Sequence, residues 1–170
     1  AARALAHFDL VRTYGQHYTF TPDASHPGVP IVLETDAFAK PARNTVAEVY
    51  DQIISDFQTA IGLMTLTRAG PFLLTRGAAQ ALLSRVYLYK EDFGSAVAMA
   101  DAVINSGTYS LVTRADYVDQ FVDGGSSEAI FEIQFTPIDK AGSYYSMFGT
   151  YGEGSRLPAR DLLDLIDPAD

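Results

Sequence analysis

A glycine-rich stretch crowded with aromatic side chains is the best candidate for chemistry in this sequence. It covers residues 142–156, and four of its positions are tyrosine or phenylalanine. Proteins hold a sugar ring by stacking its C–H face on an aromatic side chain, while polar groups fix its hydroxyls. The predicted ligand-binding residues are the rings and one guanidinium of this stretch: Tyr144, Tyr145, Phe148, Tyr151 and Arg156. The alternative is a structural role, in which these rings anchor the loop on helices or line an interface with another protein.

A second group of rings lies near the amino terminus. Tyr14, Tyr18 and Phe20 straddle the end of the first predicted helix and the start of the loop that follows. They allow a second aromatic binding patch, but large rings close to an apolar helix face usually join the core. We therefore expect core packing for these three side chains.

The sequence contains no constellation typical of catalysis or of a metal centre. His7, His17 and His26 lack the spacing of metal ligands on a helix or hairpin. Glu128 and Glu132 are four apart on a predicted strand, about 13 Å along it, which is too far for the carboxylate pair of a glycosidase. No nucleophile elbow, phosphate loop or dinucleotide fingerprint occurs. We predict a protein that is not an enzyme and has no metal and no cofactor.

Composition narrows the classes of partner. Hydrophobic residues make up 48% of the chain and charged residues 19%, as in ordered globular proteins. A net charge of −9 argues against nucleic acid and against anionic membrane surfaces. There is no cysteine, which excludes disulfides. No apolar run approaches the about 20 residues of a membrane span, and the start lacks a signal-peptide layout.

Helical periodicity dominates the first 64 residues. Apolar side chains recur every three or four positions in residues 3–14, and again from residue 46 to residue 64 behind the capping box Thr45–Glu48. Between them, residues 15–43 hold four prolines, which exclude a continuous helix. The apolar middle of this loop, residues 29–33, is expected to pack on the helices. We predict that residues 1–64 form a first helical pair with residues 15–43 as a loop insertion.

Residues 75–107 predict a second helical pair. The spacing of Leu83, Ser84, Tyr87 and Ala96 matches a tetratricopeptide repeat, which has a period of about 34 residues and small residues where its helices touch. The sequence departs from the tetratricopeptide motif at three positions: Gln80, Ala100 and Thr108. Thr75 is the expected cap, and the inward side chains of the second helix are expected to include Phe93, Ala96, Val97, Ala100, Val103 and Ile104.

The pattern changes after residue 109. Residues 109–112 are short and extended in pattern, and residues 129–135 alternate apolar and polar side chains, which predicts one strand. Residues 108–170 are thus expected to be a loop and strand region. The predicted fold class is mainly α, a tetratricopeptide-like helical repeat scaffold with long loops and a short β element after residue 109.

Five blocks of the sequence, in this order, resemble the SusD/RagB family: RALAHFDLVRTYG, GVPIVLE, PARNTVAEVYDQIISDFQTAI, TRGAAQALLSRVYLYKEDFGSAVAMADAVINSGTYSL and SEAIFEIQF. The resemblance implies a surface-exposed outer-membrane lipoprotein of Bacteroidetes that binds a glycan or another nutrient without transforming it. It also implies delivery to a partner, a SusC-like TonB-dependent transporter, and attachment to the membrane only through a lipid anchor that this sequence does not contain.

The resemblance further implies that residues 1–170 are a single fragment of a larger SusD-like domain. Both ends agree with this expectation, because Ala1 lies inside a helical pattern and RDLLDLIDPAD begins an apolar segment and stops. Two alternatives remain open. The first is a tetratricopeptide adaptor that grips a peptide, for which Arg76, Arg85 and Lys90 would be the basic residues of the groove. The second is a fragment that supplies only the face that docks on the transporter.

Overall fold

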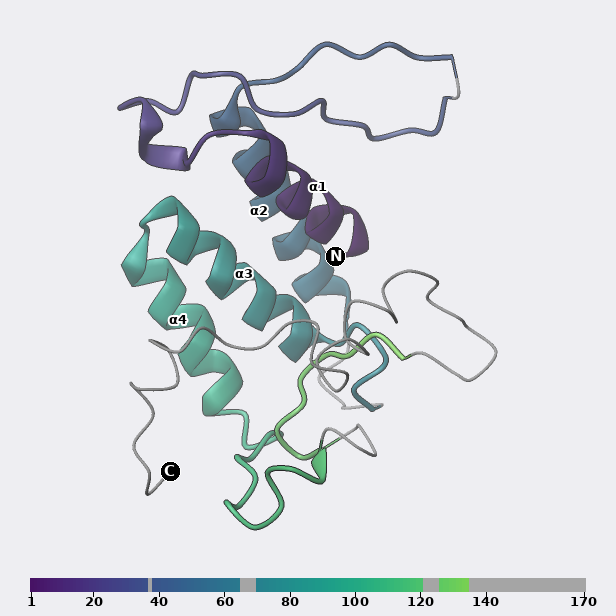
Figure 1. Ribbon diagram of the computed structural model, residues 1–170, viewed down its shortest axis with the longest axis vertical. Helices are drawn as coiled ribbons and strands as arrows, with labels where there is room; N and C mark the ends of the chain where they lie inside the picture. Colours follow the sequence, from purple (N-terminus) through teal and green to yellow (C-terminus); the bar gives the residue numbers. More distant parts are fainter. Residues whose placement is uncertain (37, 65–69, 121–125, 135–170) are drawn as a thin grey trace, which may run out of the picture. The chain divides into compact units, whose positions relative to one another are not determined.

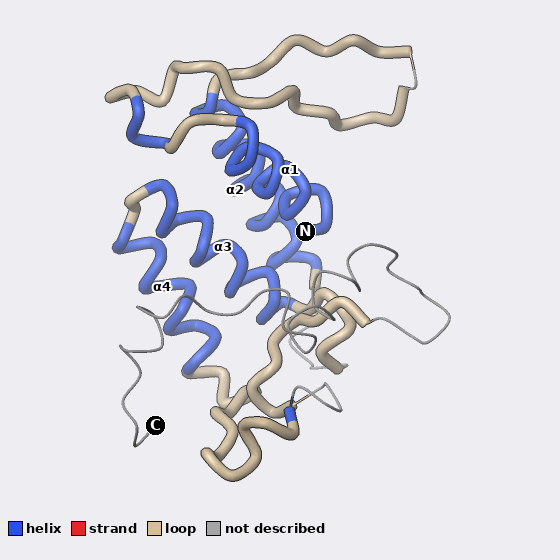
Figure 2. Tube along the Cα trace, in the orientation of Figure 1, coloured by secondary structure: helices blue, strands red, loops and turns tan. Residues whose placement is uncertain are grey.

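The computed structural model describes residues 1–36, 38–64, 70–120 and 126–134. The chain divides into two compact units, Ala1–Glu132 and Ile133–Asp170. The described part of the first unit contains helices α1 (Ala2–Tyr14), α2 (Val46–Leu63), α3 (Arg76–Lys90) and α4 (Phe93–Ile104), with a single 3-10 turn, η1 (Tyr18–Phe20). The predicted mainly helical fold is confirmed (Figures 1 and 2).

The helices pack in the order of the sequence, α1 on α2, α2 on α3 and α3 on α4. Figure 1 shows α3 and α4 side by side, joined by a tight reversal. Glu91 occupies the left-handed region in that reversal, with φ of 63°, and Asp92 caps α4 by accepting a hydrogen bond from the Ser95 amide. Helix α1 thus packs against α2 and α3 against α4, and α2 lies between α1 and α3.

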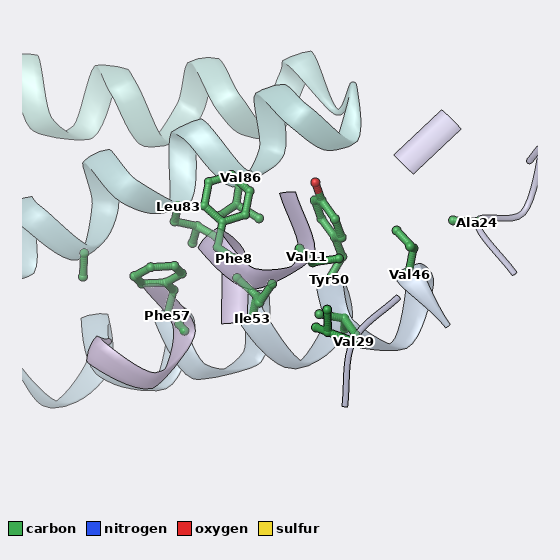
Figure 3. Packing of buried hydrophobic residues seen from close by; sticks show 13 residues of the cluster. Phe8, Val11, Ala24, Val29, Val46, Tyr50, Ile53, Phe57, Leu83 and Val86 are labelled. Carbon is green, nitrogen blue, oxygen red and sulfur yellow. The ribbon is translucent and has the colours of Figure 1, made fainter. Parts of the chain in front are cut away.

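The core fills the space around α2. Phe8 and Val11 of α1, Ile53 of α2, and Leu83 and Val86 of α3 are each at most 1% exposed. Figure 3 shows these side chains gathered between the three helices. The Phe8 ring meets the rings of Tyr50 and Tyr89 edge to face, with centroids 6.1 and 5.4 Å apart. Because α2 is covered on two sides, its apolar positions have the most regular spacing in the chain.

The amino terminus of α2 has every free amide satisfied. Thr45 and Glu48 form the predicted capping box, with the Glu48 amide donating to Thr45 Oγ1 over 3.2 Å and the Thr45 amide donating to Glu48 Oε2 over 2.8 Å. The next two amides, of Val46 and Ala47, donate to the carbonyls of His26 and Ala24. The loop before α2 therefore completes the cap, which fixes the loop on the helix.

Residues 27–36 run out from the helices, and residues 38–45 return to them (Figure 1). An antiparallel bridge joins Pro27 to Thr45 at their base. Val29 is buried there, and the Val32 amide donates to Nε2 of the buried His7 over 3.2 Å. The predicted packing of residues 29–33 is right for Val29 and Ile31, whereas Val32 and Leu33 are about half exposed.

The predicted contact of small residues between the second pair of helices is confirmed. Ser84 of α3 donates its hydroxyl to the carbonyl of Ala96 in α4 over 2.8 Å. The inward face predicted for α4 was too wide, since only Ala96 and Val103 are buried in it. Phe93, Val97 and Ile104 are 58–71% exposed. Helix α3 makes the main packing contact with α4 among the described helices, so one stripe of α4 is covered instead of two.

The predicted β element after residue 109 is not found among the described residues. The amide of Ser110 donates to the Ser127 carbonyl, and the amide of Glu132 donates to the Pro71 carbonyl. Neither residues 109–112 nor residues 129–134 form a strand in the described structure. Alternation of side chains shows a possible buried face, but a strand also needs a continuous partner. No helix within the described residues is long and apolar enough to span a membrane.

Candidate functional site

An open cavity of about 410 Å³ lies at the carboxyl-terminal end of α1, and we call it the α1-end cavity. Its volume is within the range of small-molecule sites, about 300–1,000 Å³. Its lining combines aromatic, amide, imidazole and guanidinium side chains: Thr13, Tyr14, Gly15, Gln16, Phe20, His26, Pro27 and Arg43.

Helix α1 directs Tyr14 away from the core. The buried residues Ala4, Phe8 and Val11 follow a spacing of four and three, which continues to Gly15 and passes over Tyr14. A Cβ atom at Gly15 would lie 2.8 Å from the Val11 carbonyl oxygen, so the close approach at this position requires glycine. The helix ends there, and the Tyr14 side chain is 68% exposed at the edge of the cavity.

Phe20 is held at the cavity by the buried His26. The two rings lie 5.3 Å apart at an interplanar angle of 71°. His26 Nε2 faces the Gln16 carbonyl at 3.4 Å, and Nδ1 faces Thr21 Oγ1 at 2.9 Å. Because a carbonyl can only accept, Nε2 carries the proton in the neutral ring and Nδ1 accepts from the threonine. His26 thus closes segment 16–21 into a loop that presents Phe20 with 64% of its surface exposed.

Arg43 links two segments that line the cavity through hydrogen bonds to three backbone carbonyls. Its Nε donates to the Gly28 carbonyl over 2.6 Å, and its Nη2 donates to the carbonyls of Pro27 and Tyr14 over 3.0 and 3.2 Å. The Tyr14 carbonyl is at the carboxyl end of α1, where a cation is favoured by the helix dipole. Arg43 forms no ion pair within the described residues, and it is the one Lys or Arg that lines the cavity.

Three groups with a shifted pKa have structural roles in the helical scaffold. Burial between aromatic rings raises the pKa of Tyr50 to about 12. The pKa of Asp56 is lowered because Arg3 donates to its carboxylate through Nε and Nη2, both over 2.7 Å. The pKa of Glu48 is lowered by the backbone and hydroxyl donors of Thr45. These groups hold helices and caps in place.

The structure separates the three rings of the predicted second aromatic patch. Tyr18 packs against Tyr50, with centroids 4.9 Å apart, as the core expectation required. For Tyr14 and Phe20 that expectation was wrong, because both rings are mostly exposed and line the α1-end cavity. The five predicted ligand residues of stretch 142–156 lie outside the described residues: Tyr144, Tyr145, Phe148, Tyr151 and Arg156.

Sequence reasoning missed the polar members of this cavity, Gln16, His26 and Arg43. A usable signal was present, because these residues lie at the two ends and within the proline-rich loop 15–43. Long loops in compact domains are often functional. Spacing along the chain did not show that the loop folds back to bring Arg43 against the end of α1.

A second, smaller cavity of about 320 Å³ lies between the start of α3 and the end of α4. A Cβ atom at Gly77, on its wall, would lie 2.6 Å from the Tyr109 hydroxyl oxygen, so a larger residue there would displace the Tyr109 side chain. Its lining is amide, hydroxyl and small side chains, with Tyr109 as its one ring. The α1-end cavity, with two exposed rings and a guanidinium, is the better candidate.

The chemistry available at the α1-end cavity is non-covalent binding. Tyr14 and Phe20 offer faces for stacking, while Arg43 and Gln16 offer hydrogen-bond donors. Within the described residues, no group of three or more His, Cys, Asp or Glu side chains could hold a metal ion. The Glu128 carboxylate accepts from the Val112 amide over 3.2 Å, which gives it a structural role.

Comparison with known proteins places the chain in a family. The family model of SusD-like proteins described as "Starch-binding associating with outer membrane" matches residues 1–88, more than half of the 170 residues. SusD-like protein P2 of Formosa agariphila is 33% identical over 140 residues, which cover 78% of this chain and 26% of that protein. The chain therefore belongs to the SusD-like family.

Solved structures agree with this assignment. A SusD superfamily protein from Bacteroides thetaiotaomicron matches with a TM-score of 0.75 and 35% identity, over 82% of this chain and 31% of that one. A SusD-like carbohydrate binding protein from Bacteroides vulgatus matches with a TM-score of 0.69 and 28% identity, over 85% of this chain and 31% of that one. The chain spans between about a quarter and a third of the length of these relatives.

Proposed function

We propose that this chain is part of a non-catalytic protein of the cell surface that binds a nutrient, an oligosaccharide, at the outer membrane. In this proposal residues 1–170 are one fragment of a larger SusD-like domain. The protein passes its ligand to a SusC-like TonB-dependent transporter and is attached to the membrane by a lipid anchor. Membership of a family described as starch-binding and associating with the outer membrane supports the proposal.

The observation that carries the proposal is the pair of exposed rings, Tyr14 and Phe20, on the lining of an open cavity. Large exposed rings gathered around a cavity are typical of sites that stack sugar rings. We assign the α1-end cavity as one binding surface. The aromatic stretch 142–156 is a second proposed surface, with the same stacking chemistry in its four rings and a donor in Arg156.

The expected affinity is weak. Each stacked ring contributes about 0.5–1.5 kcal/mol, and a charge-assisted hydrogen bond contributes about 1.5–3 kcal/mol. A dissociation constant of about 1 mM corresponds to about −4 kcal/mol. An affinity of this order suits capture and release better than tight storage.

Isothermal titration against a panel of oligosaccharides tests the proposal. Tyr14→Ala and Phe20→Ala report on the α1-end cavity, and Tyr144→Ala and Tyr151→Ala report on the second surface. Weaker binding in either pair supports that surface, while unchanged affinity in both variants of a pair removes it. Turnover of any oligosaccharide in the same samples would contradict the non-catalytic assignment.

The alternative of a tetratricopeptide adaptor gains no support from the basic residues it would need. Arg76 donates to the Met64 carbonyl over 3.1 Å, and Arg85 lies over the Tyr89 ring at 6.0 Å. Lys90 pairs with Asp51 at 3.5 Å. Each of these cations makes a contact within the chain, and none of them lines either of the two cavities described above, whereas a peptide groove needs its donors on the lining.

A further inference from the structure

Arg43 gives the α1-end cavity a positively charged donor, which the aromatic rings alone would not supply. The residue lines the cavity and is exposed. Its Nε and Nη2 groups donate to three backbone carbonyls, which uses all three of their N–H bonds. The Nη1 amino group has no acceptor within the described part of the chain, so its two N–H bonds remain available.

The positive charge of Arg43 is not neutralised by a carboxylate of the described chain. Glu48, an acidic residue close to it in sequence, is committed to the cap of α2, where Oε2 accepts from the Thr45 amide, the Thr45 hydroxyl and the Asn44 side chain. The lining of the cavity contains no Asp or Glu. In a chain of net charge −9, this cavity is a local site of positive charge.

We propose that the α1-end cavity takes an acidic sugar, one whose ring carries a carboxylate. The sugar ring stacks on Tyr14 or Phe20, and the carboxylate accepts from Nη1 of Arg43. This inference rests on the proposed function and adds the chemical class of the ligand. A charge-assisted hydrogen bond is roughly twice as strong as a neutral one, so the carboxylate gains more at Arg43 than a hydroxyl does.

Two pairs of oligosaccharides test this inference on the full chain. A mannuronan tetrasaccharide is compared with mannotetraose, and a glucuronan tetrasaccharide with cellotetraose, because the members of each pair differ in the carboxylate alone. We expect the acidic member of at least one pair to bind about tenfold more tightly at low salt, a difference of about 1.4 kcal/mol. The preference should shrink as salt is raised, since the guanidinium is exposed.

Two substitutions separate the charge of Arg43 from its structural contacts. R43Q and R43K both lose the fork that grips three carbonyls, but only R43K keeps the positive charge. We expect R43Q to bind both members of a pair equally, and R43K to keep the preference for the acidic member at reduced affinity. Thermal unfolding of both variants gives the loss of stability that they share.

The outcomes distinguish the two proposals. Equal binding of acidic and neutral members by the unmodified chain overturns the acidic-sugar inference and leaves the proposed function in place. A preference that survives R43Q also overturns it, because the charge would then come from elsewhere. Absence of binding to all four members, with binding to another oligosaccharide of the panel, overturns the inference alone, and absence of binding to the whole panel refutes glycan binding by this chain as well.

Discussion

Phe8 and Phe20 carry the same side chain in opposite settings, and replacing each by alanine should separate stability from binding. Phe8 is 1% exposed, and Phe20 is 64% exposed. Burial of a phenyl side chain contributes about 1.5–3 kcal/mol, and the edge contacts of Phe8 with Tyr50 and Tyr89 add about 0.5–1.5 kcal/mol each. Removing the Phe8 ring also leaves a void in the core that its neighbours fill only in part. Phe8→Ala should therefore lower the free energy of unfolding by about 3–5 kcal/mol.

Urea unfolding followed by circular dichroism measures this difference. With a slope of about 2 kcal/mol per molar urea, Phe8→Ala should move the unfolding midpoint down by about 2 M. Phe20→Ala should change the free energy of unfolding by no more than about 0.5 kcal/mol. It should instead weaken oligosaccharide binding about two- to tenfold, which is the loss of one stacking contact.

Two results would refute this reasoning. If Phe20→Ala destabilised the chain as much as Phe8→Ala, the exposed ring would be part of the core and the α1-end cavity would lose its main binding surface. If Phe8→Ala left the midpoint unchanged, the packing of α1 on α2 and α3 would not be what holds the first unit together.

Further predictions concern the scaffold beneath the cavity. Thr45→Ala removes the cap of α2 and should cost about 0.5–2 kcal/mol of unfolding free energy, whereas Thr45→Ser, which keeps the hydroxyl, should cost less in the same urea titration. Ser84→Ala should cost about 1 kcal/mol through loss of the bond to the Ala96 carbonyl, and a midpoint equal to that of the unmodified chain would show that the bond is not formed in solution. Asp56 has a lower pKa in the folded chain than in the unfolded one, so the folded state binds fewer protons; its contribution should be complete above about pH 5 and should fade as the pH falls through the lowered pKa. Asp56→Asn should therefore flatten the dependence of the unfolding midpoint on pH below 5, and an unchanged dependence would exclude Asp56 as its source. His7→Phe should speed hydrogen exchange at the Val32 amide, because that amide loses its acceptor, while exchange at the Val49 amide inside the capped turn should stay slow.

Much of the helical scaffold could be predicted because its signals are local. The capping box of Thr45 and Glu48 and the regular apolar spacing behind it located α2, and Ser84 and Ala96 identified a contact between two paired helices. Each of these features depends on residues that are neighbours on one helix or across one tight turn. Their spacing in the sequence is therefore enough to predict them.

The exposed side chains of α4 and the residues of the α1-end cavity could not be predicted, because they depend on which surfaces of the folded chain meet. Val97 and Ile104 have the spacing of inward residues, yet they are exposed because the main contact of α4 among the described helices, with α3, covers its other side. Tyr14 and Phe20 follow an apolar helix, yet Gly15 and His26 turn them away from the core. Spacing shows which face is apolar, but it does not show whether a neighbour covers that face or which distant residue, such as Arg43, arrives beside it.

Fluorine NMR of the chain labelled with fluorotyrosine tests the central claim most directly, which is that exposed rings on this helical scaffold bind an oligosaccharide. The ten tyrosines include Tyr14 at the cavity and Tyr50 in the core, where it is 3% exposed. Each resonance is assigned by replacing one tyrosine with phenylalanine. Addition of a bound oligosaccharide should shift the Tyr14 resonance and leave that of Tyr50 in place. A ligand that binds without moving the Tyr14 resonance would contradict the assignment of the α1-end cavity, and if Tyr144, Tyr145 and Tyr151 were also unmoved, the account of binding by exposed rings would fail.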